Sequence, residues 1–217
     1  MGIALAAGLL AACADEEVQP VQPLPATIAQ LTGPWQAEPF VLDPGVWARA
    51  ETGCRKDMLM GPGGRAVIVD ARGAGVLMVR ISGASVGGCH ALQILADGTI
   101  NGAGSGFSGS GPERLDTPRD LGIIQQEVAD VGGGDLKTTG WSVTGLAGRG
   151  VAAVVVAPGG AHPLVRATLA NGWYAAWWPT LPGEGDPFGR EGRPADPPHV
   201  VIRAYDVTGN QVDEVQT

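Results

Sequence analysis

Charged side chains are scarce in this chain, and those that are present are mostly acidic. They make up 17% of the 217 residues, and the 14 basic residues include only two lysines, Lys56 and Lys137. The formal net charge is −8. Nucleic acids and anionic membranes are bound mainly through clusters of lysine and arginine, so this balance argues against both kinds of partner.

Long apolar runs are missing as well. Residues 3–12 are uncharged and apolar, but a helix of that length rises only about 15 Å, half of a bilayer core. The length instead matches the hydrophobic region of a signal peptide. The run ends in Leu-Ala-Ala-Cys at residues 10–13, which resembles the lipobox of bacterial lipoproteins, where the cysteine is lipidated. The alternative is a buried apolar helix followed by a chance cysteine.

This N-terminal sequence predicts both a compartment and an anchor. We expect residues 1–12 to be a signal peptide and Cys13 to carry the lipid. Residues 13–33 would form a flexible tether, because the polar, proline-bearing stretch 14–25 cannot bury a core. The protein would then be extracytoplasmic and held at the cell membrane by its lipid.

Cysteine is also rare, with three residues in the chain. If Cys13 is lipidated, Cys54 and Cys89 remain, and in an exported protein two thiols most economically form one disulfide. The alternative is two separately buried thiols. The spacing of the two residues matches no CxxC metal or redox motif.

Familiar catalytic and cofactor motifs are absent. The chain contains no G-x-S-x-G, no phosphate-binding G-x-x-x-x-G-K and no H-E-x-x-H. Residues 104–109 match G-x-G-x-x-G, but no expected strand precedes them and no helix follows. His90, His162 and His199 show no metal-ligand spacing. We therefore expect no enzyme, no cofactor and no metal.

Glycine and proline are abundant, with 35 and 17 residues, and most glycines separate short apolar runs. Asp43-Pro44 followed by apolar residues at helical spacing predicts a helix over 44–58. The remaining pattern predicts a mainly β fold, an antiparallel β-sandwich or open barrel with one or two short helices. The expected strands are 65–70, 76–82, 89–96, 99–101, 141–147, 151–157, 164–170, 173–178, 200–206 and 211–215.

Three other segments do not follow a simple strand pattern. The Gly- and Ser-rich residues 101–111 are expected to form a flexible loop, and the proline-rich residues 179–198 a long one. Residues 117–132 have apolar side chains at helical spacing, but the β-branched pair Ile123-Ile124 leaves a strand as the alternative.

The expected elements fall into two parts. A disulfide-stapled, β-rich part with short helices would cover 34–139, and an antiparallel β part would cover 140–217. The alternative is one continuous domain.

Several motifs resemble exported actinobacterial proteins of unknown function. Residues 172–179, Gly-Trp-Tyr-Ala-Ala-Trp-Trp-Pro, and residues 204–209, Ala-Tyr-Asp-x-x-Gly, are similar to the C-terminal part of those proteins. Residues 39–44, 54–55 and 69–73 are similar as well. The resemblance implies export and a β fold, and it implies no activity.

The aromatic strand offers the best candidate for a binding surface. Successive side chains of a strand point to opposite faces, so Trp173 and Trp177 share one face and Tyr174 and Trp178 the other. By bulk we assign the first pair to the core. Tyr174 and Trp178, with Phe188 of the following loop, would then form an exposed apolar patch, a common mark of a binding surface. The alternative is a strand covered on both faces.

This hypothesis predicts unequal effects of two substitutions. Trp177→Ala would unfold or strongly destabilise the domain. Trp178→Ala would leave the domain folded and weaken its binding to a partner.

Together these observations predict a lipid-anchored, extracytoplasmic β domain that binds a cell-envelope protein or glycan and catalyses nothing. Two alternatives from other classes remain. One is a structural surface module without a specific ligand, and the other is a hydrolase whose site comes together only in the folded protein.

Overall fold

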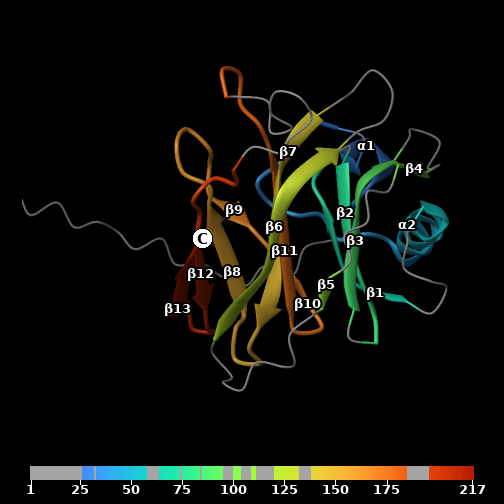
Figure 1. Ribbon diagram of the computed structural model, residues 1–217. Coiled ribbons are helices and arrows are strands. Elements are labelled where there is room, and N and C mark those ends of the chain that lie inside the picture. The colour runs from blue at the N-terminus through green and yellow to red at the C-terminus, as the bar shows by residue number, and fades with distance from the viewer. Residues whose placement is uncertain are drawn as a thin grey trace, which may run out of the picture.

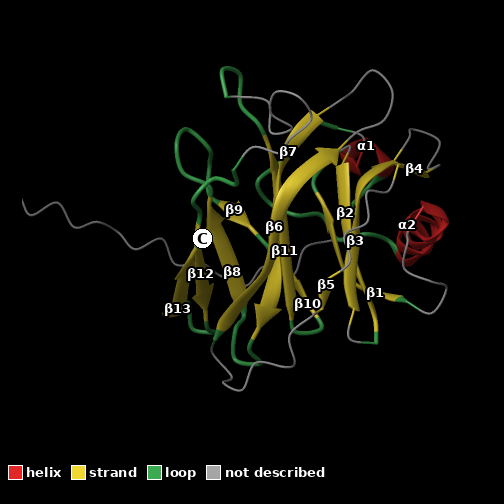
Figure 2. Cartoon of the chain, in the orientation of Figure 1, coloured by secondary structure: helices red, strands yellow, loops and turns green. Residues whose placement is uncertain are grey.

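Three antiparallel sheets stack side by side, and a helix covers one outer face of the stack (Figure 1). Helices lie on one side of the molecule only, as the colouring of Figure 2 shows for the described residues. The computed structural model describes residues 26–31, 33–57, 64–73, 75–83, 85–94, 100–103, 109–110, 120–131, 138–184 and 196–217.

Helix α2 (Pro44–Asp57) begins at the expected Asp-Pro pair. The Asp43 carboxylate caps the helix, because its Oδ1 accepts a hydrogen bond of 2.8 Å from the Gly45 N–H. Its buried face carries Val46, Ala50 and Cys54. The predicted helix is therefore confirmed as far as Asp57.

A second, shorter helix lies at a position that the sequence did not predict. Helix α1 (Ile28–Leu31) begins with a capping box, in which Thr27 and Gln30 exchange side-chain and backbone hydrogen bonds of 2.9 and 3.4 Å. Leu31 is fully buried in the core beneath α2. The expected tether over 13–33 therefore extends too far, because the chain is already part of the folded body at Ala26.

The helix-side sheet lies beneath α2, and its strands run in the order β1-β2-β3-β4 with β5 beside β3. Its strands are β1 (Arg65–Ala71), β2 (Gly75–Ser82), β3 (Ser85–Ile94), β4 (Ile100–Ala103) and β5 (Gly109–Ser110). The expected strands 65–70 and 76–82 form the antiparallel pair of β1 with β2, and 89–96 and 99–101 form that of β3 with β4. The expected loop over 101–111 is wrong at its ends, which belong to β4 and β5.

The central sheet has the order β10-β11-β7-β6. Its strands are β6 (Leu121–Val131), β7 (Thr138–Ala147), β10 (Thr168–Ala170) and β11 (Trp173–Pro179). The helix expected within 117–132 is wrong, and the strand alternative is confirmed. Strand β6 pairs with β7 from Leu121 to Val131, and this ladder satisfies the backbone groups that a helix would have paired internally.

The outer sheet has the order β13-β12-β8-β9. Its strands are β8 (Ala153–Ala157), β9 (Val165–Arg166), β12 (Val201–Tyr205) and β13 (Gln211–Gln216). The single strand expected over 164–170 is split between two sheets, since β9 pairs with β8 whereas β10 pairs with β11. The Ala167 N–H, at the crossing point, bonds to the carbonyl of Val154 at 2.8 Å.

Alternate side chains of one strand enter different cores. In β2, Val76 and Met78 pack beneath α2, whereas Leu77 and Val79 face the central sheet. The three sheets share cores in this way, and none of them closes into a barrel within the described residues. The fold is therefore a layered β-sandwich. A domain boundary at 139/140 would fall inside β7.

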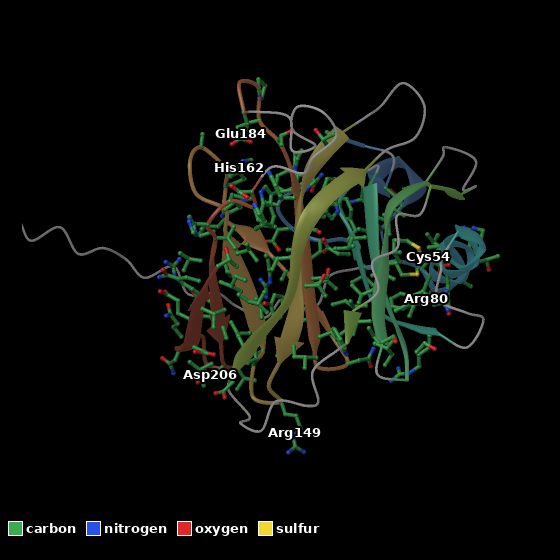
Figure 3. The ribbon with its side chains drawn as sticks, viewed as in Figure 1. Cys54, Arg80, Arg149, His162, Glu184 and Asp206 are labelled. Carbon is green, nitrogen blue, oxygen red and sulfur yellow. A yellow bond between two sulfur atoms is a disulfide. The ribbon has the colours of Figure 1, made fainter. Side chains whose placement is uncertain are left out.

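The expected disulfide between Cys54 and Cys89 is confirmed. The two Cα atoms lie 5.7 Å apart, and both side chains are buried between α2 and β3 (Figure 3). The bond fastens the only long helix of the described chain to the sheet beneath it.

Replacing Cys54 and Cys89 together by alanine should lower the free energy of unfolding by about 3–4 kcal/mol, because the bond closes a loop of 35 residues in the unfolded chain. Urea unfolding followed by circular dichroism measures the change. Reductant should weaken the wild type and leave the double variant unaffected. A double variant as stable as the oxidised wild type would contradict the expectation.

Candidate interaction surface

Strand β11 is covered on both faces. Trp173, Ala175 and Trp177 pack against the helix-side sheet, and Tyr174, Ala176 and Trp178 pack against the outer sheet. Tyr174 and Trp178 are 0% exposed, and Trp177 is 2% exposed. The expected exposed patch is therefore wrong, and the alternative of a strand covered on both faces is confirmed. Phe188 lies outside the described residues.

Tyr174 is tightly packed in the core, and burial changes the pKa of its hydroxyl. Its ring lies directly against Gly145 on β7, where an added Cβ would come within 2.4 Å of the ring. Desolvation by burial raises the pKa of the Tyr174 hydroxyl well above its usual range. Because the side chain is fully buried, it cannot contribute to an exposed binding surface.

A buried ion pair ties the three sheets together. Nε of Arg72 lies 2.6 Å from Oδ2 of Asp70, and both side chains are fully buried. The guanidinium also donates to the carbonyl oxygens of Ala37 and Arg166, while the Thr168 hydroxyl donates to Asp70 Oδ1 at 2.6 Å. We call this set the three-sheet junction, because it joins β1 to β9 and β10.

The N-terminal segment crosses beside the three-sheet junction, and this crossing requires a glycine at position 73. Gly73 has φ +84°, and a Cβ there would come within 2.4 Å of the Pro34 carbonyl oxygen. The N-terminal segment can therefore cross close to the end of β1. The side chain of Trp35 completes the crossing by donating from Nε1 to the carbonyl of Trp177 at 3.2 Å. These contacts assign the 69–73 motif a structural role.

A histidine–carboxylate pair lies at one end of the molecule. Nε2 of His162 is 2.9 and 3.1 Å from the two carboxylate oxygens of Glu184, and Figure 3 shows the two residues on neighbouring loops. Oε2 of Glu184 also accepts the N–H of Leu181 at 2.7 Å. Within the described chain, no serine, threonine or cysteine side chain bonds to this histidine. Among the described residues, the pair therefore joins two loops.

The other candidates for metal or cofactor chemistry give no site among the described residues. His199 bonds through Nδ1 to the carbonyl of Thr217. In the ranges that the structure describes, no three His, Cys, Asp or Glu side chains are placed to hold a metal ion. Cys13, the side chain of His90 and residues 104–108 lie outside those ranges.

The outward face of the outer sheet carries a different candidate. Ile202 and Ala204 of β12 point into the core, so Val201, Arg203 and Tyr205 point outward. Register then places outward residues of β13 beside them, with Gln211 opposite Tyr205. Figure 1 shows no described helix or strand beyond this face.

Five planar side chains form a continuous group on this face, which we call the β12–β13 strip. The strip consists of Arg203, Tyr205, Gln211, Glu214 and Gln216. Nε of Arg203 lies 3.0 Å from Oε2 of Glu214, and the two side chains are 33% and 35% exposed. Both glutamine side chains also donate to this carboxylate, at 3.5 and 3.3 Å.

The strip is electrostatically balanced. The hydrogen bond from Arg203 is the main reason why the pKa of Glu214 is lowered, so this carboxylate is ionised at neutral pH. The guanidinium and the carboxylate therefore cancel in net charge, and both carboxylate oxygens already accept hydrogen bonds within the strip. Sequence reasoning missed the strip, although the alternation of apolar and polar side chains from Ile202 to Tyr205 was the signal that could have found it.

The hairpin that carries the strip ends in a tightly held turn. Oδ1 of Asp206 accepts hydrogen bonds from the backbone and hydroxyl of Thr208 and from the backbone of Asn210. The side-chain hydrogen bond from Thr208 is the main cause of the lowered pKa of Asp206. This turn fixes the relative positions of β12 and β13 at the Tyr205 end of the strip.

Comparison with protein-family models, with curated proteins and with solved structures finds no match for this chain. The resemblance to exported actinobacterial proteins therefore stays a prediction. Among the described helices, none combines the length and the apolar character needed to span a membrane.

Proposed function

We propose that this protein is a lipid-anchored, extracytoplasmic β domain that binds a component of the cell envelope without catalysing a reaction. The lipid on Cys13 would hold it at the membrane, and the β12–β13 strip would contact the partner. The strip replaces the buried pair Tyr174 and Trp178 as the candidate binding surface.

The outward strip is the observation that carries this proposal. It places an aromatic ring and four planar polar groups together on the face of a sheet that no described element covers. Such combinations of an amphipathic aromatic with placed polar groups are typical of binding surfaces. Two further features support export: the lipobox-like sequence at residues 10–13, and the disulfide, which persists in oxidising compartments.

Cell fractionation tests the anchor and the binding surface in one experiment. The wild type should be recovered with membranes and carry a diacylglyceryl group on Cys13 by intact-mass analysis. The full-chain variant Cys13→Ser should lose the lipid and leave the membrane, yet still sediment with the insoluble cell wall. Adding Arg203→Ala should release it into the soluble fraction.

Arg49→Ala is the matched control, because Arg49 is exposed on α2 at the opposite side of the molecule. In the Cys13→Ser background it should sediment like its parent. An unmodified wild type that retains Met1 would contradict the lipid anchor. Equal sedimentation of the Arg203→Ala and Arg49→Ala variants would contradict the proposed binding surface.

A further inference from the structure

We propose that the β12–β13 strip recognises an extended, uncharged glycan bearing vicinal hydroxyl groups. This inference rests on the proposed function and adds the chemical class of the partner. It follows from the shape of the side chains, from their charge balance and from the extent of the strip.

The shape of the side chains suits neighbouring hydroxyls. Guanidinium, carboxylate and amide groups are planar and present two polar atoms side by side, which matches two adjacent hydroxyl groups of a sugar. Nε of Arg203 donates to Glu214, and no described residue bonds to the two terminal nitrogens of the guanidinium, which can therefore serve as donors. The Tyr205 ring offers an apolar surface with a polar tip next to them.

The charge balance separates a neutral glycan from a charged polymer. A polyanion would meet Glu214, which stays ionised because Arg203 donates to it, and a basic peptide would meet Arg203. Each of these partners would have to break the 3.0 Å pair or accept a like charge beside it. An uncharged ligand leaves the pair intact and can use the terminal nitrogens of Arg203 together with the polar atoms of Tyr205 and of the two glutamines.

The strip is also organised before binding and long enough for several sugar rings. Glu214 is held by three side chains from the same hairpin, so little side-chain freedom remains to be lost when a ligand binds. From Val201 to Tyr205 the strand rises about 13 Å, which accommodates a short run of sugar units in an extended chain.

Chemical treatment of the cell wall tests this inference with the full-chain Cys13→Ser variant. Periodate cleaves the carbon–carbon bond between vicinal hydroxyls, so oxidised wall material should no longer sediment the protein. Wall material digested with a protease should still do so, and high salt should have little effect. Tyr205→Ala and Gln211→Ala should each reduce the apparent affinity about tenfold.

Each other outcome removes the inference. Loss of binding after protease treatment of the wall would show that the partner is a protein. Binding that survives periodate but is lost in high salt would show that the partner is an acidic polymer. Both results would leave the proposed function standing. If the protein sediments with neither untreated nor treated wall material, both the proposed function and the glycan proposal are wrong. Circular dichroism on the Tyr205→Ala and Gln211→Ala variants separates loss of binding from loss of fold.

Discussion

Replacing Trp178 by alanine is expected to destabilise the protein about as strongly as replacing Trp177, by about 3–5 kcal/mol in each case. The two side chains lie on opposite faces of β11, yet each fills a core between two sheets. Truncation of either one leaves a cavity that the neighbouring strands cannot close without moving a whole sheet. A loss of this size is a large part of the stability of a typical domain.

Urea unfolding followed by circular dichroism measures both variants. Trp178→Phe is a suitable control, because it keeps an aromatic ring and removes an indole N–H that has no hydrogen-bond partner among the described residues. It should cost much less than alanine. A Trp178→Ala protein as stable as the wild type, beside an unfolded Trp177→Ala protein, would show that the outer sheet does not cover β11.

Replacing Arg72 by methionine should cost about 3–5 kcal/mol, because it leaves the Asp70 carboxylate buried without its cation. The same substitution removes the donors that serve the carbonyls of Ala37 and Arg166. The N-terminal segment and β9 would therefore lose their hydrogen bonds to Arg72, and the effect should reach all three sheets.

The double variant Asp70→Asn, Arg72→Met separates charge from packing. It removes the uncompensated carboxylate, so it should recover part of the stability that Arg72→Met loses. Thermal unfolding of the wild type, both single variants and the double variant gives the coupling between the two residues. An Arg72→Met protein with the same thermal stability as the wild type would contradict the structural role of the three-sheet junction.

Local sequence was sufficient where the deciding interactions are themselves local. The Asp43-Pro44 pair and the helical spacing of Trp47, Ala50, Cys54 and Met58 predicted α2, since both features act within a few residues. The Gly-rich turns separated the expected strands 65–70 from 76–82 and 200–206 from 211–215, and these strands pair as β1 with β2 and β12 with β13. The disulfide was predicted by elimination among three cysteines.

Two errors of assignment had a long-range cause. The apolar spacing within 117–132 fits a helix, but pairing with β7 makes the segment a strand. The run 164–170 looks like one strand, but β8 and β11 each take part of it, so it crosses between sheets. In both cases a partner distant in sequence decided between local alternatives.

The sequence by itself determined which side chains of β11 and β12 share a face, because that depends only on the alternation of a strand. It could not determine what covers each face, because sheet packing brings together residues far apart in the chain. The tertiary structure alone decided that Tyr174 and Trp178 are buried beneath the outer sheet, whereas Arg203 and Tyr205 face outward from it. The candidate binding surface moved from β11 to β12 for that physical reason.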